Sequence, residues 1–330
     1  MTGRAGERVV VTGAGGFIGG HVLARFRSEG REVVGLVRPG TDVRPRIEGV
    51  RLVERDLAAV RSLVDVLQPG DTVVHLAARA HRLVDEAANP LEAFRAANVE
   101  PVRMLCRSAA EAGIRRLIFI SSAKVFGEGR GSPYTLDDRP APADAYAQSK
   151  WEAEEVIRDA ASGGAFTWTI LRPPFVYGPG GKGNFPRLVT LARLAARVPL
   201  PLGGIANQRS MLFVGNLADA IHACACSDAA RDRTYLPTDG RDVSTPQLLR
   251  VIANVRGERT LLFSVPLPVL RTLARLLGRS AEMSRLTESL RLDSRQLVEE
   301  LGWKPPFTLE DGLAVSVGSP SGKPRERSDA

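Results

Sequence analysis

Apolar and polar positions along the first half of the chain form short β-branched runs that alternate with longer stretches of helical period. Three valines before Thr12 are typical of a buried strand, and Phe17–Glu29 repeats apolar residues at helical spacing. Because strands that alternate with helices form parallel sheets covered on both faces, the pattern predicts a doubly wound α/β fold. We expect strands at Val9–Thr12, Glu32–Val37, Val50–Glu54, Thr72–Leu76, Arg116–Ser121 and Thr167–Leu171. We expect helices at Phe17–Glu29, Ala59–Leu67, Pro90–Ala112 and Tyr146–Ala161.

The pattern changes after Leu171, where prolines and glycines become frequent. Such residues interrupt regular structure, so we expect a smaller, less regular α/β region that caps the first domain. A strand at Ser210–Val214 and a helix at Leu217–Ser227 are expected to return to the first domain. Further helices are expected at Asn184–Arg197, Thr245–Val255, Leu267–Leu277 and Ser294–Leu301.

Composition and charge exclude several classes of protein. The net charge is +8, but the arginines are spread along the chain among acidic residues, which disfavours a nucleic-acid-binding protein. No apolar stretch is long enough to span a bilayer, and the polar N-terminus does not have the pattern of a signal peptide. Three cysteines fit a reducing compartment. We therefore expect a cytoplasmic protein with no integral membrane segment and no nucleic-acid partner.

Clustered glycines follow the first expected strand directly. Gly13 permits a sharp turn, Gly16 leaves room for a pyrophosphate, and Gly19 allows the next helix to pack closely on the sheet. The free N–H groups and the dipole at the start of that helix favour a phosphate. This order of strand, turn and helix predicts a dinucleotide site.

Tyr146 and Lys150 are four positions apart, so they share one face of the predicted helix. A nearby ammonium lowers the pKa of a phenol, which is otherwise a poor base at neutral pH. Asp144 is expected to cap this helix. Ser122 follows a predicted buried strand, at the edge where such sheets bind ligands, and its hydroxyl can bond a reacting oxygen. The three side chains Ser122, Tyr146 and Lys150 form a candidate proton-transfer set.

Two other patterns are weaker. His222, Cys224 and Cys226 have the spacing of metal ligands but lie in an apolar helical run with no second cluster, so we expect no metal site. The helix at Leu267–Leu277 places arginines among leucines; a core-facing helix is favoured over one that touches a membrane.

With these residues in view, the chain resembles the extended short-chain dehydrogenase/reductase family, in its nucleotide-sugar epimerase/dehydratase group. The resemblance covers about residues 7 to 315 and includes a T-G-x-x-G-x-x-G turn from Thr12 and a Tyr146-x-x-x-Lys150 pair. The other matching motifs are Asp56-Leu57, His75-Leu76-Ala77-Ala78, Asn98-Val99, Ser121-Ser122-Ala123-Lys124-Val125-Phe126-Gly127 and Arg172-Pro173-Pro174-x-Val176-Tyr177-Gly178-Pro179-Gly180.

The resemblance implies a role for each matching position and a Rossmann-type domain. Tyr146 would be the catalytic acid/base, Lys150 would lower its pKa and hold the nicotinamide ribose, and Ser122 would bind the reacting C4 oxygen. The cofactor would also contact Thr12, Gly13, Gly16, Phe17, Ile18, Gly19, Asp56, Leu57, Leu76, Ala77, Ala78, Asn98, Pro173 and Val176. The diphosphate of a nucleotide sugar would lie near Asn184, Phe185 and Arg209.

The resemblance also implies an organisation. The dinucleotide-binding Rossmann domain would cover residues 1–175, with 210–240 returning to it. Residues 176–209 and 241–315 would bind the substrate. The last stretch, 318–330, is polar, and we expect it to form a disordered tail. Members of the family commonly form homodimers through helices that match Pro90–Ala112 and Tyr146–Ala161.

This chain departs from the family pattern at two places. Members that prefer NAD usually have an aspartate at the end of the second strand, where this chain has Val37 followed by Arg38. Arginine can accept the 2′-phosphate of NADP, so we expect an NAD(P) cofactor with a preference for NADP. Sugar dehydratases usually have a threonine and acidic residues where this chain has Ser122-Ala123, so dehydration is disfavoured.

These observations lead to one reaction class. We expect an enzyme that moves a hydride between nicotinamide and C4 of a nucleotide-linked sugar, as a 4-reductase or a 4-epimerase, and resemblance to bacterial members suggests surface-polysaccharide synthesis. Reduction of non-sugar ketones is a further enzymatic alternative. A cofactor-sensing regulator without catalysis is disfavoured, because such proteins typically lose the tyrosine or the lysine.

Overall fold

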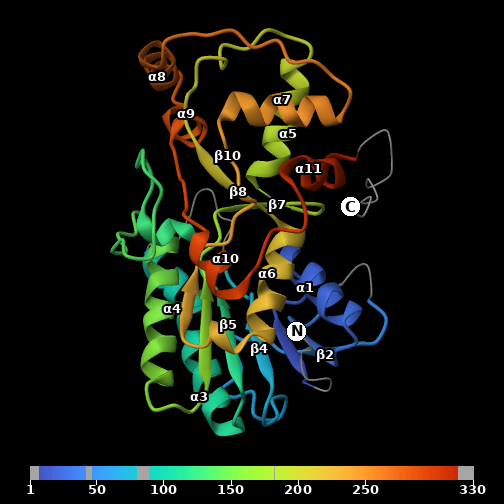
Figure 1. Ribbon diagram of the computed structural model, residues 1–330. Helices are drawn as coiled ribbons and strands as arrows, with labels where there is room; N and C mark the ends of the chain where they lie inside the picture. Colours follow the sequence, from blue (N-terminus) through green and yellow to red (C-terminus); the bar gives the residue numbers. More distant parts are fainter. Residues whose placement is uncertain (1–6, 42–46, 80–88, 182, 319–330) are drawn as a thin grey trace.

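The computed structural model describes residues 7–41, 47–79, 89–181 and 183–318. Seven parallel strands form the larger sheet (Figure 1), with Val9 of an interior strand paired to Val33 on one side and Thr72 on the other. The doubly wound α/β prediction is confirmed. The strands lie in the order β3 (Val50–Glu54), β2 (Val33–Val37), β1 (Val9–Thr12), β4 (Thr72–His75), β5 (Arg116–Ile120), β6 (Thr167–Leu171) and β9 (Arg233–Tyr235).

Helices cover both faces of this sheet. On one face, α1 (Phe17–Ser28) and α6 (Val214–Cys226) pack on the side chains of Val9 and Val11. On the other face, α3 (Glu100–Ala112) and α4 (Ala145–Ala161) pack on Val10. Every residue of β1 is buried. Because successive side chains of a strand point to opposite faces, β1 contributes to the hydrophobic core on each face of the sheet.

A smaller sheet of three strands lies above the larger one in Figure 1. The strand expected at Ser210–Val214 belongs to this sheet and not to the larger one, while the helix after it packs on α1. The smaller sheet contains β10 (Asp242–Val243), β8 (Arg209–Phe213) and β7 (Phe175–Tyr177). Around it and along its edges lie α5 (Asn184–Ala195), α7 (Thr245–Val255), α8 (Leu267–Leu276), α9 (Ser280–Thr287) and α11 (Leu309–Val317). Helix α10 (Arg295–Leu301) instead packs through Leu297 on the core of the larger domain, with α1 and α6.

Two helix predictions in the first half were wrong. Residues 59–67 form two turns and no helix, because Ser108 of α3 accepts the Leu63 amide at 2.9 Å and anchors the segment between the turns. The helix expected over residues 90–112 is divided at Val99 into α2 (Pro90–Asn98) and α3. Pro101 near the start of α3 lacks an N–H and so suits the first turn of a new helix.

The core-facing prediction for residues 267–277 was also wrong in large part. Only Leu270 and Ala274 of α8 are buried. None of the helices that the structure describes combines the length and the apolar character needed to cross a bilayer. The predicted disordered tail lies, apart from Gly318, outside the described residues.

Candidate functional site

The glycine turn between β1 and α1 is too tight for larger residues. Gly13 has a φ of 66°, and an added Cβ would lie 2.8 Å from the Ala77 amide nitrogen. At Gly19 an added Cβ would lie 2.5 Å from the carbonyl oxygens of Gly13 and Ala14. Helix α1 begins after Gly16, with no side chain capping it and no acidic residue in its first turn. Its first N–H groups are therefore suited to a phosphate, and the residues present fit a dinucleotide cofactor.

A buried hydrogen-bonded group joins the ends of β1 and β4 below this turn. Thr12 Oγ1 lies 2.8 Å from His75 Nδ1 and accepts the Ala77 amide at 3.3 Å. Burial lowers the pKa of His75 to about 3, so this imidazole is neutral at physiological pH. Thr12 thus fixes the start of the Leu76–Ala78 segment, which the family resemblance assigns to the cofactor.

Tyr146 and Ser122 come together in the structure. Asp144 caps α4 as predicted, because its carboxylate accepts the Ala147 amide at 2.7 Å. This cap places Tyr146 in the first turn of the helix, where its hydroxyl lies near the Ser122 side chain. Burial raises the pKa of Tyr146 to about 12, against the opposing effect of the nearby Ser122 hydroxyl. Burial, and not the expected effect of Lys150, therefore dominates this pKa.

Lys150 lies one turn further along α4 and is almost fully buried. Its ammonium sits 4.0 Å from the centroid of the Phe119 ring, a cation–π contact that partly replaces water. Burial lowers the pKa of Lys150 to about 7, and the charge of Glu154 acts in the opposite direction. The lysine is thus poised to change its charge near neutral pH.

Asn98 connects the cofactor-side loop to the catalytic helix. Its Oδ1 accepts the Arg79 amide at 2.8 Å, and its Nδ2 donates to Ser149 Oγ at 2.9 Å. Ser149 in turn donates to the carbonyl of Tyr146 at 2.8 Å. A buried amide that bonds on both sides fixes the distance between the two elements. The contacts fit the predicted role of Asn98 in supporting the cofactor region.

A buried ion pair behind Lys150 was not predicted. Arg172, at the end of β6, donates from Nε and Nη2 to the two carboxylate oxygens of Glu154, at 3.0 and 2.7 Å. The next residue, Pro173, accepts the Ala123 amide at 2.9 Å. The pair therefore anchors α4 beside the segment that carries Ser122. An acid four positions after the lysine and an arginine before two prolines were the only signals in the sequence.

The predicted adenine-side residues lie where neighbouring strands end. Arg38 is exposed directly after β2, and Asp56 follows β3, its carboxylate accepting the Ala58 amide at 3.1 Å. Leu57 is half-buried against the core. Carboxyl ends of parallel strands are the ligand-binding edge of this type of sheet.

The predicted substrate residues differ in their surroundings. Asn184 begins α5, and Phe185 is buried with its ring centroid 5.7 Å from that of Tyr177. Arg209 on β8 donates from Nη1 to the Arg285 carbonyl at 2.6 Å and lies 4.0 Å from Glu128. Phe185 thus acts mainly through packing. The Arg209 guanidinium is positioned by the Arg285 carbonyl and by Glu128.

The candidate metal pattern is accounted for by packing. His222 packs on Phe26 and lies 3.6 Å from the Cys226 sulfur, while Cys224 is fully buried. In the part of the chain that the structure describes, no cluster of three or more metal-ligating side chains is present.

Comparison with known proteins gives the context of this site. The model of the NAD dependent epimerase/dehydratase family matches residues 9–235. A Vibrio cholerae UDP-glucose 4-epimerase is 36% identical over 93% of each chain. An Escherichia coli O157:H7 N-acetyl-α-D-glucosaminyl-diphospho-ditrans,octacis-undecaprenol 4-epimerase is 26% identical over 93% of each chain. The structure of MoeE5 in complex with UDP-glucuronic acid and NAD is 27% identical, with a TM-score of 0.74, and the match covers 94% of this chain and 97% of that one.

The family match spans the glycine turn, Ser122, Tyr146 and Lys150, and the sheet order agrees with a Rossmann-type fold. The chain therefore belongs to the NAD-dependent epimerase/dehydratase family of extended short-chain dehydrogenases/reductases.

Proposed function

We propose that this protein is a 4-epimerase of a UDP-linked hexose. The observation that carries the proposal is that Tyr146 lies near Ser122 and one helical turn from Lys150, at the carboxyl edge of the sheet beside the glycine turn. The 36% identity with a UDP-glucose 4-epimerase over nearly the whole chain supports this reaction and this nucleotide.

In the proposed reaction, the Tyr146 phenolate removes the proton from the C4 hydroxyl and later returns it. Ser122 Oγ donates a hydrogen bond to the C4 oxygen. A nicotinamide held beside the glycine turn would supply reversible hydride transfer at C4, with return to the opposite face of the sugar and no net oxidation. Because burial raises the pKa of Tyr146 to about 12, the phenolate needs the Lys150 ammonium beside the substrate.

A product assay tests the reaction. Purified protein is incubated with UDP-glucose, UDP-galactose and their N-acetyl forms, and the products are identified by NMR. We expect the C4 epimer with no net change in nicotinamide absorbance. Stoichiometric oxidation of NADH or NADPH with a 4-keto-6-deoxy sugar nucleotide would instead establish the 4-reductase alternative.

A substitution tests the proton-transfer role. Tyr146→Phe should lower turnover by about 100-fold or more, since it removes the acid/base. Cofactor binding, followed by protein fluorescence, should persist in this variant. Unchanged turnover would exclude the proposed mechanism.

We propose in addition that Arg38 allows the cofactor site to prefer NADP. The exposed position of Arg38 after β2 supports this, since the position at the end of that strand is Val37 and not an aspartate that would repel a 2′-phosphate. Arg38→Asp should shift the ratio of NADP to NAD affinity by about tenfold towards NAD. Tighter binding of NAD than of NADP by the natural chain would disprove the preference.

We also propose the organisation that the resemblance implies, with the substrate held by residues 176–209 and 241–315 and two copies paired through α2–α3 and α4. Sedimentation velocity should then give a particle of two 35.5 kDa chains. A role in surface-polysaccharide synthesis would follow from the identity of the sugar found in the product assay.

A further inference from the structure

The outer end of the capping region exposes large apolar side chains, which we call the apolar cap. Each member is between 45% and 78% exposed. Exposed apolar groups are common singly, but a group of this size in one place marks an interaction surface. The apolar cap consists of Leu261, Phe263, Val269, Leu273, Leu276 and Leu277.

Four members share one side of α8 and its end. Val269, Leu273, Leu276 and Leu277 follow at intervals of four, three and one, which places them on one helical face. The buried positions Leu270 and Ala274 lie on a neighbouring face that packs inward. Helix α8 is therefore strongly amphipathic, yet part of its apolar side faces away from the protein.

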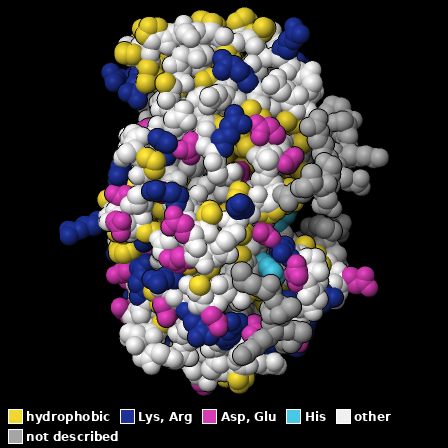
Figure 2. Space-filling model, in the orientation of Figure 1, with side chains coloured by type: hydrophobic (Ala, Val, Ile, Leu, Met, Phe, Trp, Pro, Cys, Tyr) yellow, Lys and Arg dark blue, Asp and Glu magenta, His cyan; other side chains and the backbone are white. Residues whose placement is uncertain are grey.

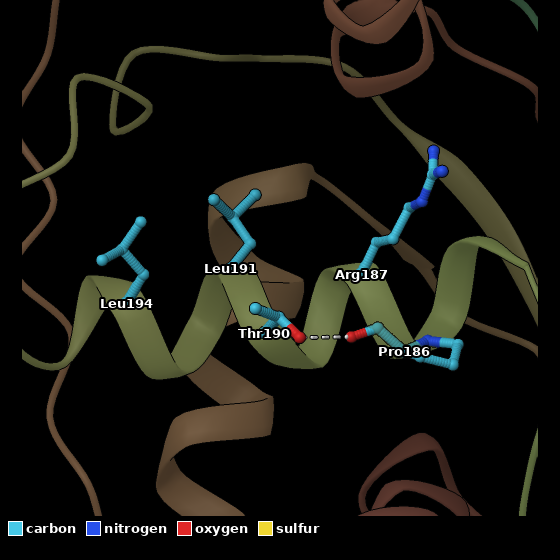
Figure 3. Close-up of a pocket in the computed structure, with 5 residues that line it drawn as sticks. All are labelled: Pro186, Arg187, Thr190, Leu191 and Leu194. Carbon is cyan, nitrogen blue, oxygen red and sulfur yellow. Dashed lines mark hydrogen bonds between the residues drawn. The ribbon is translucent and has the colours of Figure 1, made fainter.

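The apolar cap continues to the end of α5. The Leu261 amide donates to the Ala195 carbonyl at 2.7 Å, and the Phe263 amide donates to the Leu200 carbonyl at 3.0 Å. Leu194, just before this contact, is also exposed and borders a hollow of about 320 Å³ along α5 (Figure 3). In Figure 2 hydrophobic side chains gather along the upper edge of the molecule, where Figure 1 places α8.

Positive charge surrounds the apolar cap. Residues 186–198 and 256–285 contain nine arginines and two glutamates. Both glutamates face an arginine of the same segment, Glu258 with Arg256 at 3.0 Å and Glu282 with Arg279 at 3.7 Å. Within the described residues Arg271 and Arg275 of α8 form no ion pair. This end of the protein therefore attracts an anionic surface.

We propose that the apolar cap docks on an anionic lipid bilayer, with α8 lying in the interface. Leucine and valine side chains would enter the headgroup boundary, while Arg271 and Arg275 would extend to lipid phosphates. Apolar area and basic charge together match the chemistry of such a surface, since arginines near an anionic leaflet are attracted to it. A second copy that docked by the same surface would bring its own excess of arginines against these, which disfavours self-association here.

Docking would connect the lipid surface to the candidate site through α9. Helix α9 follows α8 after a short turn, and its Arg285 carbonyl accepts Arg209 Nη1 at 2.6 Å. The docked helix is thus linked through α9 to the residue predicted to contact the sugar diphosphate. The docking proposal itself does not depend on which sugar is used.

Vesicle flotation tests the proposal with the full-length protein. Vesicles of phosphatidylcholine are compared with vesicles that also contain phosphatidylglycerol, at low and at physiological salt. We expect binding to the anionic vesicles, weaker binding as salt increases, and little binding to phosphatidylcholine alone. Failure of the natural chain to float with anionic vesicles would overturn the proposal.

Matched variants identify the surface. Leu273→Ser with Leu276→Ser, and separately Arg271→Ser with Arg275→Ser, should each reduce the bound fraction at least tenfold. Leu52→Ser, which removes an exposed leucine of β3, should leave it unchanged. Thermal unfolding and cofactor binding verify that the variants are folded. If the double leucine variant misfolds, the single variant Val269→Ser is used in its place.

Two other outcomes would contradict the proposal. Binding that survives both α8 variants would place the lipid contact elsewhere. Sedimentation velocity could also detect a dimer of the natural chain that is lost in the Leu273→Ser, Leu276→Ser variant. That result would show that a second copy covers the apolar cap.

Discussion

The position of Lys150 on α4 is determined by the sequence, whereas its charge state is determined by burial. Its location one turn after Tyr146 follows from helical spacing, whereas its pKa of about 7 follows from the absence of water around it. The ammonium and the amine should therefore both be populated near neutral pH in the protein described here.

We predict that the Lys150 side chain titrates with a midpoint near pH 7. Carbon-13 labelling at lysine Cε gives few signals, because the chain has five lysines, and the Lys150→Met variant assigns the relevant one. Because the folded pKa is below the usual 10.5, the unfolded chain binds more protons between these values. The contribution of this group to stability should thus rise with pH from about 7 to about 10. A midpoint near 10 would show that water reaches Lys150.

Asn98 is a positioning residue, since its contacts are to the chain and not to reacting atoms. Asn98→Ala would release the Arg79 amide and the Ser149 hydroxyl, which set the loop against α4. We expect kcat to fall by about 10- to 100-fold, because small displacements of reacting groups have large effects on rate. Steady-state kinetics with Asn254→Ala, an exposed position on α7, provide the control. If Asn98→Ala lowered thermal stability but left kcat unchanged, the role of Asn98 would be purely structural.

Sequence alone predicted the residues of this site that lie close together along one element. Asp144, Tyr146 and Lys150 are within one helix, so their spacing determines their geometry. The Glu154–Arg172 pair joins α4 to β6 across 18 positions, and helical or strand periods carry no information on such contacts. The raised pKa of Tyr146 was missed for the same reason, since burial depends on the whole site.

At the scale of elements, the turn into α1 provides a controlled comparison between neighbouring glycines. Gly19→Ala would place a methyl group 2.5 Å from two carbonyl oxygens, whereas an added Cβ at Gly20 meets nothing within 4 Å. We expect Gly19→Ala to cost about 1–3 kcal/mol and to weaken cofactor binding at least tenfold. Gly20→Ala should instead stabilise the helix by about 0.5–1 kcal/mol.

Urea unfolding and cofactor titration of the two variants decide this prediction. If Gly19→Ala retains both stability and cofactor affinity, the close packing of α1 on the turn does not govern the site. A loss caused by Gly20→Ala would mean that the helix, and not the glycine turn, is sensitive to any added side chain.

Long elements with strong periods were predicted well, and short ones were not. The strands β7 and β9 have three residues each, too few to show an alternating pattern. Residues 59–67 have helical spacing, but a serine of another helix captures a backbone amide there. Helix α8 has the apolar content of a core helix, and its partial exposure depends on what the rest of the capping region leaves uncovered.

At the scale of the whole molecule, one buried carboxylate joins the small sheet to α6. Asp239 accepts hydrogen bonds from the Phe213 amide at 2.8 Å, Asn216 Nδ2 at 2.7 Å and the Tyr177 hydroxyl at 2.9 Å. Asn216 also bonds to the backbone of Phe307, just before α11. These hydrogen bonds therefore link β7, β8, α6 and the C-terminal part of the chain. Sequence patterns do not predict which of these elements contact one another.

We predict that Tyr177→Phe destabilises the protein by about 1–3 kcal/mol, because it leaves a buried carboxylate oxygen without its donor. Burial raises the pKa of Asp239 to about 6, and the tyrosine bond acts against that rise. Between about pH 4 and pH 6 the folded state therefore binds more protons than the unfolded chain, and the contribution of Asp239 to stability falls as pH rises. Loss of the Tyr177 hydroxyl should extend this window upward.

The pH dependence separates this explanation from a simple packing defect. The carboxylate needs its donor most when it is charged, so the loss of stability in Tyr177→Phe should be larger at about pH 8 than at about pH 5. Tyr134→Phe is the control, since the Tyr134 hydroxyl has no hydrogen bond to another described residue, and its effect should be small at both values. Urea unfolding at the two pH values measures the difference. An equal loss at both would mean that Asp239 stays uncharged in the folded protein and that Tyr177 links the two parts of the molecule through ring packing alone.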